Sequence, residues 1–135
     1  MENFSNEKIN LLAEKVVGFI LTDDDKSAIQ TLKPLLDARC PFSKLDFLGK
    51  EIGQSGIDAN DNFFKAFDEI IDYNAMGGFV VVGQALIQFL ENDFEKVMNK
   101  SREYIIKGNE WYVCDIIGER SLGQALVNHF NKTIP

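Results

Sequence analysis

The residues best suited to chemistry are an aromatic residue and an acid in the segment from Asn109 to Phe130. Trp111 and Asp115 are four residues apart, so a helix places them on one face. An indole beside a carboxylate forms a surface for an electron-poor or cationic partner. In the structural alternative, the Trp belongs to the core and the Asp favours the positive end of a helix. These residues alone leave both interpretations open.

A helix must position this pair, and the sequence predicts where it starts. Asn109 is suited to cap a helix whose first turn holds Glu110, Trp111 and Tyr112, because an Asn side chain accepts from free backbone N–H groups. The helix is then expected to run through Asp115.

Basic residues suited to phosphate contact are few. The net charge is −7, and the excess of acids lies in the first two-thirds of the chain. Binding to a polyanion needs clustered Lys and Arg that displace counterions. The best available set lies in the last third: Lys96, Lys100, Arg102, Lys107 and Arg120.

The segment also resembles a known family, the HEAT-like-repeat DNA alkylation-repair proteins. These proteins carry a helix of the form W-x-x-x-D, followed by an apolar segment and Leu-Gly. Here the matching residues are Trp111, Asp115 and Leu122-Gly123. The resemblance implies that Trp111 and Asp115 lie in the DNA-facing concave surface of an α-solenoid. It also implies that Asp115 assists departure of a cationic alkylated purine.

On this hypothesis the protein is a DNA glycosylase that excises alkylated purines. A cationic purine is already a good leaving group, so a carboxylate that stabilises the developing sugar cation and orients water suffices. Asp115 has that role. The expected substrate contacts are Trp111 and Tyr112, as aromatic faces, and Lys100, Lys107 and Arg120, as phosphate ligands.

Two departures from that family favour a different function. The family usually continues beyond the motif with further DNA-facing aromatic and arginine residues, and the present chain is acidic. We therefore favour a binding module that holds a protein or nucleic-acid partner on its concave face, with the glycosylase as the alternative. Whether the chain is an enzyme stays open, and we expect no metal and no cofactor.

Composition favours one all-α domain over residues 1–135. The chain is 45% hydrophobic, with eleven Phe and three Pro, which is too apolar for disorder and lacks the alternation typical of strands. The start has no secretory pattern, so a cytoplasmic location is expected. The uncharged segment 73–90 contains Asn, Gln and Gly, which favours a buried helix over a membrane span.

An apolar-Gly step recurs at Gly49, Gly83 and Gly118, with spacings near 35 residues. Such a period predicts stacked helix pairs, that is, an α-α superhelix of the HEAT or armadillo type with about six or seven helices. In such an array the glycines permit close helix approach. Coincidence is the alternative, because the three copies are weak.

Local signals set the expected helix boundaries. Ser5 or Asn6 opens the first helix, and the run Asp23 to Asp25 starts the second rather than forming a metal site. We expect a kink or break at Pro34. Asp58 to Asp61 should cap a later helix.

The remaining signals concern a turn and two thiols. Gly77-Gly78 should form a turn, and Asn92 or Asp93 should open the helix that follows the buried one. Cys40 and Cys114 lack a Cys-x-x-Cys pattern or a nearby His, so both should be buried, unpaired thiols.

Overall fold

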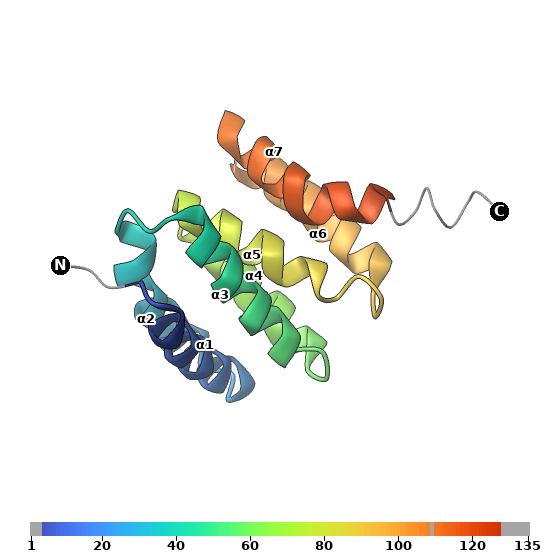
Figure 1. The fold of residues 1–135 in the computed structure, drawn as a ribbon. Helices are drawn as coiled ribbons and strands as arrows, with labels where there is room; N and C mark the ends of the chain where they lie inside the picture. Colours follow the sequence, from blue (N-terminus) through green and yellow to red (C-terminus); the bar gives the residue numbers. More distant parts are fainter. Residues whose placement is uncertain (1–3, 109, 128–135) are drawn as a thin grey trace.

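The protein is all-helical in the part of the chain that the structure, a computed structural model, describes. That part is residues 4–108 and 110–127, without the side chain of Trp111. It forms seven α-helices, within the predicted number: α1 (Asn6–Leu21), α2 (Asp25–Asp37), α3 (Phe42–Ser55), α4 (Asn60–Asp72), α5 (Met76–Ile87), α6 (Phe94–Gly108) and α7 (Trp111–Ile117). A π-helical segment, η1 (Gly118–Leu122), follows α7, and residues 123–127 are helical again (Figure 1).

The helices fall into two sets that alternate along the chain. The odd-numbered helices α1, α3, α5 and α7 pack in that order, each against the next. The even-numbered helices α2, α4 and α6 lie side by side, joined by polar contacts between Asp37 and Tyr73 and between Asp68 and Tyr104. Neighbours within a set run in the same direction, as Figure 1 shows for α3 and α5.

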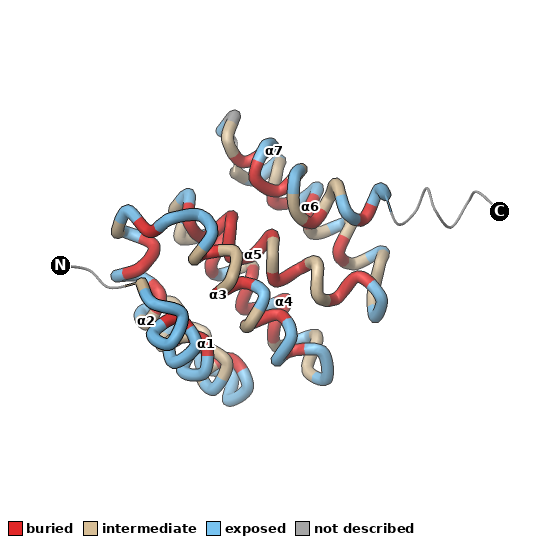
Figure 2. Tube along the Cα trace, viewed as in Figure 1, coloured by how far each residue is buried: buried red, intermediate tan, exposed pale blue. Residues whose placement is uncertain are grey.

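Helix α5 lies at the centre of the molecule. Its residues Gly77 to Gly83 are all buried, together with Ala85 and Leu86, and Figure 2 shows it buried along most of its length. A helix with apolar residues all round is expected to have neighbours on several sides, and α3, α4, α6 and α7 all contact α5. Phe89 lies just beyond the end of α5, and three rings of α4 pack around it: Phe63, Phe64 and Phe67.

Several predicted boundaries are confirmed. Ser5 caps α1 by accepting from the Lys8 N–H, and Asp24 caps α2 by accepting from the Ser27 N–H. Asp93 accepts from the Lys96 N–H at 3.2 Å at the start of α6. A Ser or Asp side chain in this position satisfies an N–H group that has no partner within the helix.

The expected break at Pro34 is wrong, because α2 continues through Pro34 to Asp37. Pro34 is exposed, so water can reach the carbonyl of Gln30 that loses its helical donor. The proline therefore removes one backbone hydrogen bond from α2 without ending the helix.

Two other local predictions are also wrong. Gly77 and Gly78 lie inside α5, and the turn is formed earlier by Asn74, whose φ of 62° is a left-handed value that Asn tolerates. The N-cap of α4 is Ala59 and makes no side-chain cap, because a tight turn from Gly56 to Ala59 places Ala59, rather than an acid, at the cap.

Cys40 and Cys114 do not form a disulfide with each other, as expected. Cys40 is buried, but Cys114 is exposed, so the prediction that both are buried is wrong for Cys114. Cys114 lies on the side of α7 away from Val113 and Ile117, which face the core. Within the described residues, no helix is long and apolar enough to span a membrane.

Candidate functional site

The predicted pair lies at the start of α7. Asp115 is exposed, and the backbone of α7 is helical over both Trp111 and Asp115, so the four-residue spacing holds. Tyr112 is half-buried, and its ring packs edge-on against Phe79 of α5 at 6.5 Å between centroids. The N-cap is Glu110, without a side-chain cap. The predicted cap, Asn109, and the Trp111 side chain lie outside the described residues.

The helix that carries Asp115 does not continue as a regular α-helix. The N–H of Gly123 donates to the carbonyl of Gly118, five residues back, which is the π-helical pattern. A side chain at Gly123 would clash with that carbonyl, so glycine is required for this local winding. π-Helical turns are frequent at functional sites, which makes the region around Asp115 worth testing.

Arg120 points away from solvent and joins three helices. Its Nε donates to one oxygen of Asp46 on α3 at 2.7 Å, and its Nη2 donates to the other at 3.1 Å. Its Nη1 donates to the Ile116 carbonyl, and the guanidinium lies 5.9 Å from the Phe42 ring centre. A bidentate Arg–carboxylate pair has strong geometric specificity. The side chain is 12% exposed, so its donors are directed into the protein.

Gly83 on α5 makes this long contact possible. A Cβ at Gly83 would lie 3.2 Å from both Cβ and Cδ of Arg120. The Arg120 side chain therefore crosses α5 at the glycine to reach α3. The ion pair could not be predicted from local patterns, because Asp46 and Arg120 are 74 residues apart in the sequence.

Lys100 and Lys107 lie in the other helix set, on the side of α6 that faces α4. The Nζ of Lys100 lies 3.1 Å from both carboxylate oxygens of Asp68, and Lys107 is paired with Asp72. The bond with Asp72 raises the pKa of Lys107. Arg120 instead faces α3 and α5, so the structure does not bring the three predicted phosphate ligands together.

These lysines belong to a series of polar contacts along the even-numbered helices. The Tyr104 hydroxyl donates to Asp68 at 2.5 Å, and the Tyr73 hydroxyl donates to Asp37 at 2.7 Å. Burial, followed by the bond to Asp68, raises the pKa of Tyr104. Both bonds join residues 36 positions apart. The sequence did not lead us to this series, although the second Asp and the second Tyr each follow the first by 31 residues, which was a usable signal.

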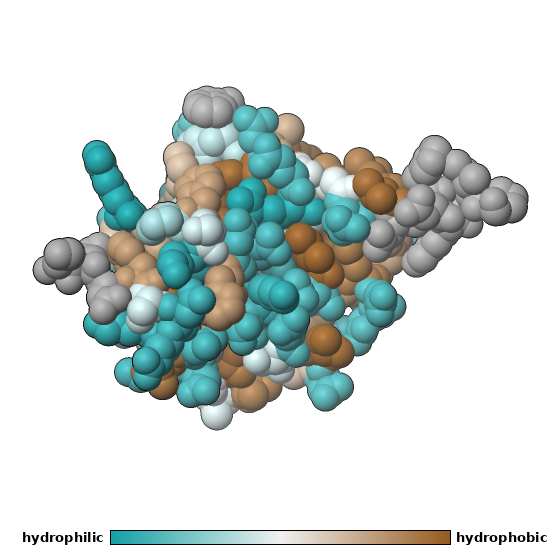
Figure 3. All heavy atoms as spheres, in the orientation of Figure 1, coloured by the Kyte–Doolittle hydropathy of each residue, from teal (hydrophilic) through white to brown (hydrophobic). Residues whose placement is uncertain are grey.

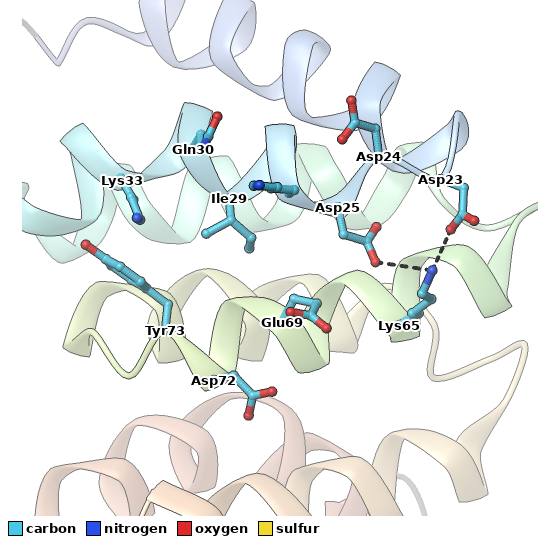
Figure 4. Close-up of a pocket in the computed structure, with 11 residues that line it drawn as sticks. Asp23, Asp24, Asp25, Ile29, Gln30, Lys33, Lys65, Glu69, Asp72 and Tyr73 are labelled. Atoms are coloured by element: carbon cyan, nitrogen blue, oxygen red, sulfur yellow. Dashed lines mark hydrogen bonds and ion pairs between the residues drawn. The ribbon is translucent and has the colours of Figure 1, made fainter.

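A hollow of about 660 Å³ lies between α2 and α4 (Figure 4). Lys65 lies 2.7 Å from Asp23 and 3.7 Å from Asp25. Burial raises the pKa of Asp25, and the charge of Lys65 opposes that shift. Asp72 points away from α2 in Figure 4, toward α6 and its partner Lys107. Three of the five acids that line this hollow, Asp23, Asp25 and Asp72, thus lie near a lysine.

No group of His, Cys, Asp and Glu in the described part of the chain has the arrangement of a metal site. Comparisons with protein-family models, with curated proteins and with solved structures found no match. The function must therefore be argued from the arrangement of the side chains themselves.

Proposed function

We propose that the chain is a helical-repeat interaction module, an α-α superhelix of the HEAT or armadillo type related to the DNA alkylation-repair proteins. Its concave face would hold a protein partner. Such modules stack similar helix pairs and expose an extended surface to a partner.

The recurrence of contacts supports the repeat. Asp37 and Tyr73 join α2 to α4, and the same pair of residue types, Asp68 and Tyr104, joins α4 to α6. The second pair follows the first by 31 residues at both positions. In the odd-numbered set, Gly49 lies against α5, and Gly83 lies against Arg120. The Asp–Tyr contact, and a glycine facing the next element of the odd-numbered set, thus recur at a spacing close to one helix pair.

A protein partner is favoured over DNA because the basic side chains expected to bind phosphate are already paired with carboxylates. Lys100, Lys107 and Arg120 each face a carboxylate of a neighbouring helix. A phosphate that binds any of them would have to compete with that carboxylate. At Arg120, whose side chain is 12% exposed, it would also have to separate a partly desolvated ion pair. The net charge of −7 adds repulsion of a polyanion at long range. A protein partner need not displace these carboxylates, and it need not be a polyanion.

The second candidate is the alkylpurine DNA glycosylase. The exposed carboxylate of Asp115, directly before a π-helical turn, supports it. In that mechanism the charge on Asp115 stabilises the sugar cation as the alkylated purine leaves with the electrons of the glycosidic bond. Water oriented by the same carboxylate then adds to the sugar, so no covalent enzyme intermediate is needed.

A single-turnover assay separates the two candidates. The substrate is duplex DNA that carries 7-methylguanine, with the protein in excess, and the released base is measured for wild type and for Asp115→Asn. The interaction module predicts equal, background-level release from both proteins. Release that is present in wild type and lost in Asp115→Asn, with the fold intact by circular dichroism, would overturn it in favour of the enzyme.

A further inference from the structure

A second concave feature lies where the link between α2 and α3 passes the start of α5. This groove has a volume of about 380 Å³. Its apolar walls come from Leu36, Cys40, Phe42, Leu45 and Met76. Ligand pockets usually fall between roughly 300 and 1,000 Å³, so the groove has room for one or two side chains rather than a large organic ligand.

The rim of the groove exposes two large apolar side chains. Phe42 is 43% exposed and Met76 is 42% exposed. Figure 3 shows a face on which patches of hydrophobic residues lie among hydrophilic side chains. A Met side chain has three rotatable bonds and adapts to the shape of a partner. An apolar hollow with such a rim is suited to receive a protruding apolar residue.

Charge distinguishes this groove from the rest of the acidic protein. Among the described residues, Arg39 is the one charged residue that lines it, and no carboxylate does. Arg39 is exposed, and it forms no ion pair within the described part of the chain. Met76 and Gly77, which also line the groove, are the first residues of α5, where the helix dipole is positive. The groove is therefore complementary to a negative group.

We infer that this groove docks a short protein segment in which a large apolar side chain lies next to a carboxylate. The apolar side chain enters between Phe42 and Met76, and the carboxylate pairs with Arg39 in the forked geometry that guanidinium groups favour. The inference rests on the proposed interaction function and names the chemical class of the partner.

Amide chemical shifts of the ¹⁵N-labelled protein test this inference residue by residue. The probe is the peptide Ser-Glu-Leu-Phe-Glu-Ser. We expect saturable shifts of the amides at residues 38–40, 42 and 76–78. The comparison peptides are Ser-Lys-Leu-Phe-Lys-Ser, which reverses the charge, and Ser-Glu-Ala-Ala-Glu-Ser, which removes the apolar anchor, and both should bind roughly ten-fold more weakly or not at all.

Arg39→Glu supplies the matched variant, with Lys50→Glu as its control, because both residues are exposed and undergo the same charge change. Arg39→Glu should weaken binding of the acidic peptide roughly ten-fold, whereas Lys50→Glu should not.

Four results would overturn the inference: no saturable shift at these amides, equal binding of the acidic and basic peptides, equal losses in the two variants, or shifts of the same amides on dilution of the free protein. The last result would assign the groove to a second copy of this chain. A failed peptide titration leaves the base-release result untouched, so the two proposals fail separately.

Discussion

Two interfaces of α5 contain glycines of the recurring apolar-Gly step, yet they are built differently. On the α3 side, Gly49 and Gly53 lie so close to α5 that a Cβ at either position would come within 3.0 Å of α5 atoms, backbone carbonyls among them. On the η1 side, a Cβ at Gly83 would instead lie 3.2 Å from side-chain atoms of Arg120. At the first interface the helix backbones are in contact. At the second, the glycine leaves space for the Arg120 side chain to cross α5.

This difference shows why the repeated apolar-Gly step does not by itself specify function. At Gly49 the missing side chain brings two helices together, as the sequence analysis expected. At Gly83 it lets Arg120 bind Asp46 and so removes Arg120 from the set of free cations. At Gly118, the third position, a Cβ would have no neighbour within 4 Å.

The largest effect is expected from Gly49→Ala. The added methyl group collides with the Val81 carbonyl and with Gln84, and backbone atoms cannot yield as a flexible side chain can. We expect a loss of about 3 kcal/mol or more in the free energy of unfolding, measured by urea titration. Gly18→Ala is the matched control, because nothing lies within 4 Å of its Cβ position. Equal effects in the two variants would refute the close contact.

Removal of the Asp46 carboxylate should have the next largest effect. Asp46→Ala leaves the guanidinium of Arg120 partly desolvated without its bidentate partner, so we expect a loss of about 1–3 kcal/mol. A double-mutant cycle with Arg120→Met should give a coupling energy of at least about 0.5 kcal/mol. Strictly additive losses in denaturant unfolding would show that the pair is not coupled.

Gly83→Ala should have a smaller effect than Gly49→Ala. The new methyl group meets the stem of Arg120 at 3.2 Å, and a long side chain can move by a few tenths of an ångström. The gain in helix propensity of about 1 kcal/mol partly offsets the crowding. We expect a net change within about 1 kcal/mol in thermal unfolding. A loss as large as that of Gly49→Ala would mean that the two interfaces are equivalent.

Gly118→Ala should have the smallest effect, and of the opposite sign. Its φ is −62°, a helical value, and its Cβ position is open. Alanine costs less backbone entropy, so we expect a gain of roughly 0.5–1 kcal/mol. A lower melting temperature for this variant would contradict the open position.

Much of the fold was predictable because it rests on local signals. The caps Ser5 and Asp24 and the buried, uncharged helix α5 each depend on residues close in sequence. Pro34 and the pair Gly77-Gly78 misled the prediction. Pro34 is tolerated because it is exposed, so that water can reach the carbonyl left without a helical donor, and the two glycines lie in the first turn of a helix that begins at Met76.

The polar contacts of the candidate site were less accessible from the sequence. Whether Lys107 or Arg120 is available for a ligand depends on Asp72 and Asp46, which lie on other helices. Local patterns identify the basic residue but not its partner, which depends on how the helices pack. The exposure of Cys114 likewise depends on helix packing and could not be predicted from local patterns.

The most direct test of the central claim is the affinity of the protein for a short DNA duplex at about 50 mM and about 200 mM salt, measured by fluorescence anisotropy. If Lys100, Lys107 and Arg120 are committed to carboxylates, wild type and the Lys100→Gln/Lys107→Gln variant should both show no saturable binding at either salt concentration. Tight binding of wild type that falls steeply with salt, and that the double variant loses, would contradict the account and return these residues to a DNA-binding role.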